Sequence, residues 1–353
     1  MVSVIIVNYH CAELTARAVR SAFDDCETCQ VIVVDNSESS EEAEKLSALL
    51  PLQTEIIIAK RNLGFGKACN LGLTRCIHEH IFLLNPDTKV IQGCMHHLKK
   101  ALDADSRLGA VSPQAFWDEA LAFFLPPGQL QTPLWETLFA ISYRWSWFGE
   151  RFSQWFKKYT LQTIMASQAI AQGMLSGGHM MLTKTTIAKL GYLFDEAFFL
   201  YYEDTDLNYR LTKSGFSLAV VPEAKVVHFW QSSASKGRYV PESRKIYFEK
   251  HFSNSFLLRL KQIIEKFSCV PPRAYTDLGN VSTPPCFALN KACEPWVLEI
   301  SQNRLLIPAA TYLFNTEECT IPNEIWELLD HGEFWVRIGH IHSQGEVIRW
   351  TKI

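Results

Sequence analysis

Residues 2–85 alternate between short apolar runs and segments with helical spacing. Strands are predicted at 2–8, 30–36, 54–59 and 80–85, and helices at 13–23, 39–50 and 64–76. Each predicted strand is a continuous run of apolar, mostly β-branched residues, which is typical of parallel strands buried on both faces of a sheet. The regular alternation of strand and helix predicts an α/β fold built on a doubly wound sheet.

Polar side chains close three of these predicted strands, at Asn8, Asp35 and Asn85–Asp87. Parallel strands end at the same edge of a doubly wound sheet, and ligands bind outside that edge. Within LLNPDTKVI (83–91), a turn alone would account for the proline and the aspartate, and so would a metal site at the strand end. The three polar ends gathered at one edge favour the metal site.

Size, charge and apolar content limit the class of protein. The chain has 353 residues, 48% of them hydrophobic, which predicts two domains. A net charge of −3 provides no basic field, so we expect no nucleic-acid partner. We recognise no signal peptide, and no apolar stretch reaches the ~20 residues of a membrane-spanning helix. We therefore expect a cytoplasmic protein, at most peripheral on the inner face of the cytoplasmic membrane, with reduced cysteines.

An aromatic-rich segment at 116–165 departs from the alternating pattern. Its tryptophan, phenylalanine and tyrosine residues are interleaved with Arg144, Arg151, Lys157 and Lys158. The segment is predicted to be either a helical layer packed over the sheet or a contact with a membrane interface or a lipid-linked substrate. Both interpretations are open at this point.

A turn-rich stretch at 269–286, with two Pro-Pro pairs, predicts a linker between two units. The units are then residues 1–268, in which 116–165 is an insertion, and residues 287–353. The second unit contains the short apolar runs WVLEIS, RLLIP, EFWVRIGHIH and EVIRWTKI, separated by turn residues. This pattern predicts a small C-terminal β-sandwich.

Several motifs follow one another along residues 2–260: VSVIIVNY, VIVVDNS, RNLGFGKACNLGL, LLNPD, GG, FDEAFFLYYEDTDLNYRLTKSG and VVH. Their order and spacing resemble those of family 2 glycosyltransferases, and most of all the bacterial rhamnosyltransferase-like branch. The resemblance implies a GT-A fold, a nucleotide-sugar donor, a divalent cation (Mg²⁺ or Mn²⁺) and inversion at the anomeric carbon. The C-terminal stretch, notably LLDHGEFWVRIGHIHSQGEVIRW, more loosely resembles a fibronectin type III module.

Asp87 is the predicted metal ligand, because a cation that neutralises a leaving diphosphate needs a carboxylate on a rigid strand end. The family often has Asp-x-Asp here, where this chain has Asn85-Pro86-Asp87, so a further ligand gains importance. His228, at the end of KVVH, resembles the histidine that completes the metal shell in some relatives. A turn-forming Asp87 and a partly buried structural His228 are the alternatives.

The resemblance also implies a donor pocket at the strand ends. Asp35 resembles the aspartate that binds the base or ribose, and Asn8, Tyr9 and Asn85 are expected to line the same pocket. A tight turn is predicted at Arg61, Asn62, Gly64 and Gly66. It would either let the backbone approach the nucleotide closely or be an ordinary connection between a strand and a helix. The Gly-Gly pair, Gly177 and Gly178, is assigned to the acceptor side.

The stretch YYEDTDLNYR places Glu203 and Asp204 at a predicted helix N-terminus. In the functional interpretation, one of them is the general base that takes the proton of the acceptor hydroxyl in an inverting reaction. Asp204 is preferred over Glu203, and Asp206 is expected to brace the helix. In the structural interpretation, the acids only interact with the helix dipole.

Together these features predict an inverting, metal-dependent glycosyltransferase of bacterial surface-polysaccharide synthesis, acting on a glycan or lipid-linked glycan acceptor. The resemblance alone favours dTDP-rhamnose as the donor, with a UDP-hexose or UDP-N-acetylhexosamine as the alternative. A non-catalytic carbohydrate-binding protein is a hypothesis from another class. The presence of Asp35, Asp87, Glu203, Asp204 and His228 argues against it.

Overall fold

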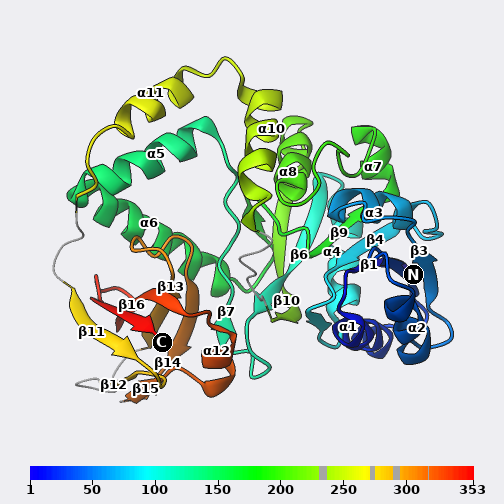
Figure 1. The fold of residues 1–353 in the computed structure, drawn as a ribbon, viewed down its shortest axis with the longest axis horizontal. Helices are drawn as coiled ribbons and strands as arrows, with labels where there is room; N and C mark the ends of the chain where they lie inside the picture. Colours follow the sequence, from blue (N-terminus) through cyan, green and yellow to red (C-terminus); the bar gives the residue numbers. More distant parts are fainter. Residues whose placement is uncertain (230–236, 271–274, 289–294, 317) are drawn as a thin grey trace. The chain divides into compact units, whose positions relative to one another are not determined.

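The computed structural model describes residues 1–229, 237–270, 275–288, 295–316 and 318–353. These residues form two compact units, whose segments can be followed by colour in Figure 1. The first unit contains Met1–Ala115, Gly128–Leu130 and Ala166–Ser253, and the second contains Phe116–Pro127, Gln131–Met165 and Asn254–Ile353. Each unit is therefore assembled from segments that are far apart in the sequence.

The first unit is built on strands in the order β3–β2–β1–β4–β9–β6. Their bounds are β1 (Val2–Asn8), β2 (Gln30–Asp35), β3 (Glu55–Ile58), β4 (His80–Leu84), β6 (Leu108–Phe116) and β9 (His179–Thr183). Strand β1 pairs in parallel with β2 and β4, and β2 pairs in parallel with β3, whereas β9 is antiparallel to β4 and β6. The four parallel strands predicted from the sequence are confirmed to within one residue at each end.

Helices cover both faces of this sheet. They are α1 (Ala12–Asp25), α2 (Ser40–Leu49), α3 (Phe65–Leu73), α4 (Cys94–Ala104), α7 (Lys184–Leu190) and α8 (Glu203–Lys213). Successive residues of β1 point to opposite faces, so Val4 and Ile6 pack with α1, α2 and α4, while Ile5 and Val7 pack with α3 and α8. The predicted doubly wound α/β architecture, expected of a GT-A fold, is confirmed.

The long strand β10 (Ser217–His228) extends the first unit. It pairs with β5 (Thr88–Val90), β6 and β8 (Ile170–Gln172). Helix α10 (Val240–Phe252) follows, and its aromatic side chains Tyr247 and Phe252 contact Tyr209 of α8. The pairing of β10 with β5 is important for the site, because β5 begins one residue after Asp87.

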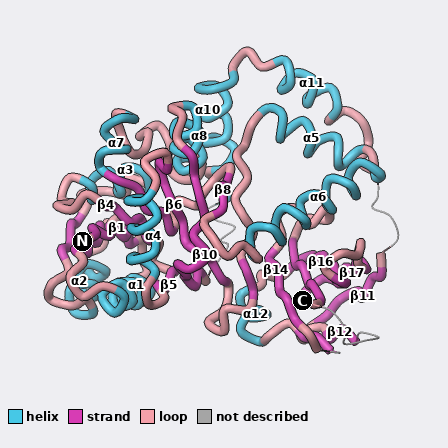
Figure 2. The backbone as a smooth tube through the Cα atoms, turned by 180° about the vertical axis from the view of Figure 1, so that it is seen from behind, coloured by secondary structure: helices cyan, strands magenta, loops and turns pink. Residues whose placement is uncertain are grey.

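The second unit contains a mostly antiparallel sheet in the order β11–β17–β16–β13–β14–β7 and a separate two-stranded pair, β12–β15. The strands are β7 (Phe123–Phe124), β11 (Thr276–Val281), β12 (Cys286–Ala288), β13 (Trp296–Ser301), β14 (Ala310–Phe314), β15 (Glu318–Thr320), β16 (Gly332–His340) and β17 (Glu346–Lys352). The helices are α5 (Pro133–Arg144), α6 (Ser146–Ile164), α11 (Phe256–Ile264) and α12 (Asn323–Leu328). Figure 2 shows α6 running alongside strands of this sheet.

Both faces of the second sheet are covered, and α6 covers one of them. Leu298 of β13 packs with Trp326 and Trp350 in one core, while its neighbour Val297 packs with residues of α6 in another. On the α6 side, the Arg337 guanidinium donates to the Glu299 carboxylate, with an Nη2–Oε1 distance of 2.7 Å. Nη1 of Arg337 donates to Ser153 Oγ of α6 at 2.8 Å. The aromatic-rich segment is therefore part of the core that the C-terminal strands complete.

The division into units differs from the domain boundaries predicted at residues 268 and 287. The aromatic segment 116–165 was expected in the first domain, but all of it except Gly128–Leu130 clusters with Asn254–Ile353. Within the predicted linker 269–286, residues 276–281 form β11, and residues 271–274 lie outside the described residues. The cause is long-range packing of α5 and α6, which leaves no local signal in the sequence.

The predicted C-terminal strands are present, with one exception. RLLIP (304–308) has a buried apolar centre, residues 305–307, but is not a strand in the structure, where its peptide bond Ile307–Pro308 is cis. The fibronectin type III resemblance is not confirmed, because β11 is parallel to β17 and α6 covers one face of the sheet. Among the described residues, no helix has the length and apolarity needed to cross a bilayer, and the cysteines form no disulfide.

The Arg337–Glu299 pair allows a test of the second unit. The two side chains are each 2% exposed, and removing one partner of such a pair leaves an uncompensated buried charge, which costs about 3–5 kcal/mol. We expect Glu299→Leu to lower the free energy of unfolding by about this amount and Glu299→Leu/Arg337→Met to recover most of the loss. Urea unfolding of both variants measures this, and equal losses would contradict the interpretation.

Candidate active site

The strand register brings the predicted site residues to one edge of the first unit. Asn8 at the end of β1 is opposite Asp35 at the end of β2, and Leu84 at the end of β4 is opposite His179 at the start of β9. His228, the last residue of β10, is opposite Thr88, which follows Asp87. The expectation that the polar strand ends gather at one edge is therefore met by the backbone geometry.

Asn8 lies behind this edge and organises it. Its side chain is 0% exposed. Its Nδ2 donates to Asp35 Oδ1 at 3.0 Å and to Ser37 Oγ and Glu42 Oε1 at 3.1 Å each. Its Oδ1 accepts from Thr15 Oγ1 at 2.8 Å. The sequence predicted that Asn8 lines the donor pocket. The structure places it underneath, because its hydrogen bonds to the protein leave it no exposed surface.

The other predicted donor-side residues fall into two groups. Asp35 is 1% exposed and accepts hydrogen bonds from Asn8 and from the backbone N–H of Ser37. Tyr9, in contrast, is 48% exposed, and Arg61 is also exposed. A rigid buried carboxylate beside two exposed, larger side chains is an arrangement that can hold a ligand with polar and planar parts.

Asn36 is a site residue that the sequence analysis missed. Its Oδ1 accepts from the Leu63 N–H at 2.7 Å, and its Nδ2 donates to Asn62 Oδ1 at 2.9 Å and to the Gly64 carbonyl at 3.2 Å. Asn36 thus fixes the turn that contains Asn62 and Gly64 against the end of β2. The only signal in the sequence was its position directly after Asp35.

Glycines allow close approaches around the site. Gly64 has a φ of +78°, and a Cβ there would lie 2.1 Å from the Phe199 carbonyl oxygen. A Cβ at Gly66 would meet Phe194 at 3.1 Å and Glu203 at 3.6 Å, so α3 passes close to the start of α8. The Gly64–Gly66 turn therefore serves close packing of the protein on itself, in addition to any approach of a nucleotide.

The Gly-Gly pair connects the two halves of the site. The Gly177 N–H donates to Asp204 Oδ2 at 3.2 Å, and the Gly178 carbonyl accepts from the Asn85 N–H at 2.7 Å. A Cβ at Gly178 would lie 2.6 Å from Asn85 Nδ2, and one at Gly177 would lie 3.0 Å from Asp204 Cβ. These two residues must be small for Asp204 and Asn85 to occupy their places.

Asp87 and His228 form the predicted metal-binding pair. Asp87 Oδ1 lies 3.3 Å from His228 Nε2, and the side chains are 21% and 9% exposed. The His228 ring packs edge-on against His179 at a centroid distance of 5.4 Å, and Nδ1 of His179 lies 2.9 Å from Ser112 Oγ. Burial, together with the neighbouring His228, lowers the pKa of His179 to about 3. His179 is therefore a neutral support for the His228 ring.

One carboxylate and one imidazole suit a divalent cation that takes its remaining ligands from phosphate and water. No cluster of three or more histidine, cysteine, aspartate or glutamate side chains able to hold a metal occurs among the described residues.

Glu203 and Asp204, at the start of α8, have different surroundings. Glu203 is 5% exposed, and its Oε2 has no hydrogen-bond partner among the described residues. Burial, reinforced by Asp204, raises the pKa of Glu203 to about 8. Asp204 is less buried, and its Oδ1 accepts from the Thr205 N–H at 2.7 Å. Burial raises the pKa of Asp204 too, while the hydrogen bonds from Gly177 and Thr205 act in the opposite direction.

The chain enters α8 through a strained turn. Tyr201 and Tyr202 have φ angles of 68° and 66°, in the left-handed region that side chains other than glycine rarely adopt. Two hydrogen bonds hold the preceding residues, from the Phe65 N–H to the Phe199 carbonyl at 3.0 Å and from Ser243 Oγ to the Leu200 carbonyl at 2.8 Å. Strain of this kind persists only where the surroundings impose it, and it is common at functional sites.

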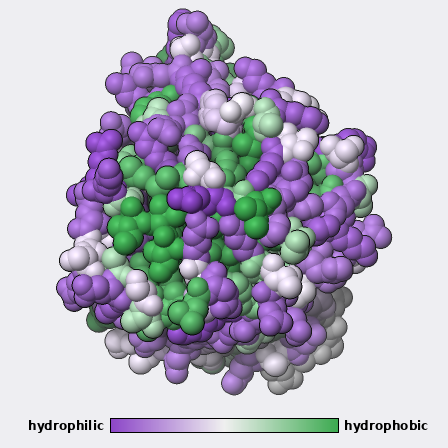
Figure 3. All heavy atoms as spheres, turned by 90° about the vertical axis from the view of Figure 1, so that its right-hand side faces the viewer, coloured by the Kyte–Doolittle hydropathy of each residue, from purple (hydrophilic) through white to green (hydrophobic). Residues whose placement is uncertain are grey.

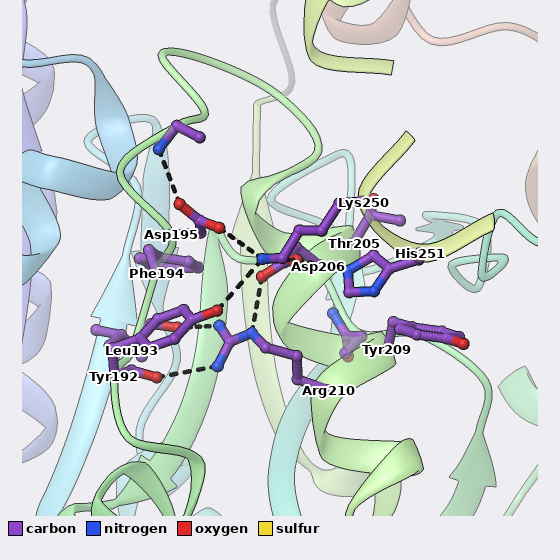
Figure 4. Close-up of polar contacts among 12 residues, drawn as sticks. Tyr192, Leu193, Phe194, Asp195, Thr205, Asp206, Tyr209, Arg210, Lys250 and His251 are labelled. Carbon is purple, nitrogen blue, oxygen red and sulfur yellow. Dashed lines mark hydrogen bonds and ion pairs between the residues drawn. The ribbon is translucent and has the colours of Figure 1, made fainter. Parts of the chain in front are cut away.

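Asp206 braces α8, as predicted, although the partners could not be foreseen (Figure 4). It is 0% exposed and accepts from Arg210 Nε, from Lys250 Nζ and from His251 Nε2, each at 2.7 Å. Lys250 and His251 belong to α10, so one carboxylate joins the two helices. Lys250 also contacts Asp195, which ties the loop before α8 to the same network.

Comparison with known proteins identifies part of the chain. Residues 3–163 match the family described as Glycosyl transferase family 2. This part of the chain, slightly less than half of it, is similar to a family 2 glycosyltransferase domain. The matched range includes Asp35 and Asp87 and ends before Gly177, Asp204 and His228, so the roles of those three residues rest on their positions in the fold.

Two curated relatives are 26% identical to this chain over 178 residues. Both are named N-acetylglucosaminyl-diphospho-decaprenol L-rhamnosyltransferase and come from Mycobacterium tuberculosis, strains CDC 1551 / Oshkosh and ATCC 25618 / H37Rv. The match covers 47% of this chain and 56% of each relative, so the chain spans about half the length of these proteins. The structure of GalNAc-T7 with UDP, GalNAc and Mn²⁺ aligns with a TM-score of 0.47 at 16% identity, covering 76% of this chain and 55% of that chain.

The raised pKa of Glu203 makes stability depend on pH. Because this pKa is 4.5 in the unfolded chain and about 8 in the folded protein, the folded protein keeps a proton that the unfolded chain releases. The stabilisation from this proton is fully present below about pH 4.5 and is lost as the pH rises toward about 8. We expect the free energy of unfolding to fall across this window and to fall less in Glu203→Gln. Chemical denaturation at several pH values tests this, and parallel slopes would contradict it.

Proposed function

We propose that the first unit is an inverting glycosyltransferase that uses a nucleotide-sugar donor and a divalent cation. The observation that carries the proposal is the arrangement around Gly177–His179. At one end of this segment Asp204 accepts from the Gly177 N–H, and at the other end His179 packs against His228, which contacts Asp87. Two residues of extended chain span at most about 7 Å. The proposed base and the proposed cation-binding pair are thus close enough along this segment to act on one sugar.

In this proposal the nucleotide lies over the ends of β1 and β2. Asp35 is fixed by Asn8 and accepts hydrogen bonds from the base or ribose, and Asn36 holds the adjacent turn in place. Asp87 and His228 would hold the cation, which neutralises charge on the leaving diphosphate. Because Asp35 and Asn36 are already fixed by internal hydrogen bonds, little ordering is required when the donor binds.

Asp204 is the proposed general base. Its carboxylate is oriented by N–H groups of Gly177 and Thr205, and it is more exposed than Glu203. A raised pKa makes this carboxylate a stronger base, which suits a group that deprotonates the acceptor hydroxyl. Glu203 is buried and, with its raised pKa, stays largely protonated at neutral pH. We assign it a supporting role beneath Asp204.

A glycan-binding protein without turnover is the competing hypothesis. A buried carboxyl oxygen without a hydrogen-bond partner destabilises a fold, and binding alone gives no reason to keep one. Glu203 Oε2 is such an atom among the described residues. This observation favours catalysis over binding alone.

The names of the curated relatives support a more specific proposal. Those proteins are named for rhamnosyl transfer to a decaprenol-diphosphate-linked sugar. We extend this to dTDP-rhamnose as donor and a lipid-linked glycan as acceptor in bacterial surface-polysaccharide synthesis, acting from the cytoplasmic side. A UDP-hexose or UDP-N-acetylhexosamine remains the alternative donor, and a thermal-shift screen of nucleotide sugars with and without Mn²⁺ would distinguish them, because a bound ligand stabilises the fold.

The first functional test is Asp87→Asn. We expect this change to abolish almost all sugar transfer, because the remaining imidazole is a poor site for a hard cation, while the melting temperature changes by only a few degrees. Calorimetric titration with Mn²⁺ in the presence of a nucleoside diphosphate should lose its signal. Full activity in this variant would return Asp87 to the status of a turn residue.

The second test separates the two acids of α8. We expect Asp204→Asn to lower turnover by at least ~10² while donor affinity is kept, because general-base assistance is typically worth ~10²–10⁴. The helix should lose only about 0.3–1 kcal/mol of dipole interaction. Glu203→Gln is the matched control, and we expect a smaller loss of turnover. The reverse order of losses would make Glu203 the base, and two active variants would place the base elsewhere.

A further inference from the structure

Helix α6 has a solvent-facing stripe in which tryptophan and basic residues alternate. The exposed positions Trp147, Arg151, Trp155, Lys158 and Gln162 follow one another at intervals of three or four residues. Trp147 and Trp155 are 55% and 50% exposed, although the helix buries its opposite side in the second unit. The Arg151 guanidinium lies 5.7 Å from the centre of the Trp147 ring, so the cation and the ring form one amphipathic surface.

Helix α11 repeats this pattern. Its exposed side chains are Phe256, Arg259, Gln262 and Ile263, followed beyond the helix by Glu265, Lys266 and Phe267. Phe256, Ile263 and Phe267 are 72%, 55% and 58% exposed. The two stripes meet where the Phe267 ring lies 6.2 Å from the ring of Trp145, which directly precedes α6. We call the exposed residues of these two stripes, together with Trp145, the aromatic-basic surface.

Charge separates this surface from ordinary exposed apolar residues. Apolar residues also reach the surface elsewhere, as patches among hydrophilic residues in Figure 3 show, so exposure alone indicates no partner. Among the exposed residues of α6, of α11 and of the stretch to 267, however, four are basic (Arg151, Lys158, Arg259 and Lys266) and one, Glu265, is acidic, in a chain whose net charge is −3. An excess of positive charge combined with half-exposed tryptophans is typical of helices that lie in a membrane interface.

We propose that the aromatic-basic surface binds the second unit to a membrane that contains anionic lipids. Indole rings favour the headgroup level, where the apolar ring is buried and the N–H stays hydrated, while arginine and lysine interact with lipid phosphates. The surface would give the enzyme access to an acceptor that is confined to a bilayer. This biological purpose rests on the proposed function, whereas the binding itself depends only on these helices.

The test is cosedimentation of the full chain with vesicles of phosphatidylcholine, alone or mixed with phosphatidylglycerol. We expect the wild type to bind the mixed vesicles and to be released by high salt. Arg151→Glu/Lys158→Glu should weaken this binding at least about tenfold, because each basic residue near an anionic surface contributes several-fold. Trp147→Ser should weaken it as well, with a blue shift of tryptophan fluorescence on binding that is smaller than in the wild type.

Matched controls come from the first unit. Leu52→Ser and Lys100→Glu change an exposed apolar residue and an exposed cation, and both should bind vesicles like the wild type. A wild type that ignores anionic vesicles, or an Arg151→Glu/Lys158→Glu variant that binds them unchanged, would overturn the inference. Donor hydrolysis measured without vesicles tests the proposed function separately, so vesicle binding and enzymatic activity can fail independently.

Discussion

The amide of Asn8 is the interaction on which the arrangement of the site depends. One side chain joins the end of β1 to Asp35 of β2, to Glu42 of α2 and to Thr15 of α1. Glu42 in turn accepts from the Ala12 N–H at 2.8 Å, so the start of α1 is held by the same group. Because all of these atoms are buried, each unmade hydrogen bond would be costly, and the network has only one satisfactory geometry.

The second constraint is the close packing of α8 against neighbouring backbone. Gly66, Gly177 and Gly178 leave room for Glu203, Asp204 and Asn85, and the left-handed residues Tyr201 and Tyr202 direct the chain into the helix. Asp206 then fixes the helix from its other side through α10. The two acids are therefore held by a frame that tolerates strain and an unmatched carboxyl oxygen, a combination found where geometry matters more than local stability.

Local pattern explains which features could be predicted from the sequence. Strands β1 to β4 and helices α1 to α3 are encoded by apolar runs and helical spacing within each segment, and their polar ends pointed to Asp35 and Asp87. The part played by Asn36 could not be predicted, because it depends on the path of a turn 26 residues away. The burial of Asn8 could not be predicted either, because a polar residue at a strand end is equally suited to contact a ligand or the protein.

The same limit explains the second unit. RLLIP has the composition of a strand but does not pair as one. Its apolar side chains Leu305 and Ile307 instead pack against Phe152 and Phe156. The aromatic segment could be interpreted as core or as interface. One side of α6 packs with the C-terminal strands, in agreement with the core interpretation, and the other exposes Trp147 and Trp155, for which the interface interpretation stays a proposal. Sequence composition records which residue types are present, whereas only the helix geometry assigns them to a side.

The discontinuous second unit also has a consequence for how the chain is made. On the ribosome, α5 and α6 emerge well before β13, which begins at Trp296, and until then Leu161 and Ile164 have only Phe124 of β7 as a strand partner. Residues Ala166–Ser253 of the first unit are synthesised between two segments of the second unit. During that time most of this apolar face of α6 is exposed to solvent in the nascent chain. Chaperones should therefore bind the nascent chain mainly at α6. Chains whose synthesis stops before the C-terminal strands should aggregate.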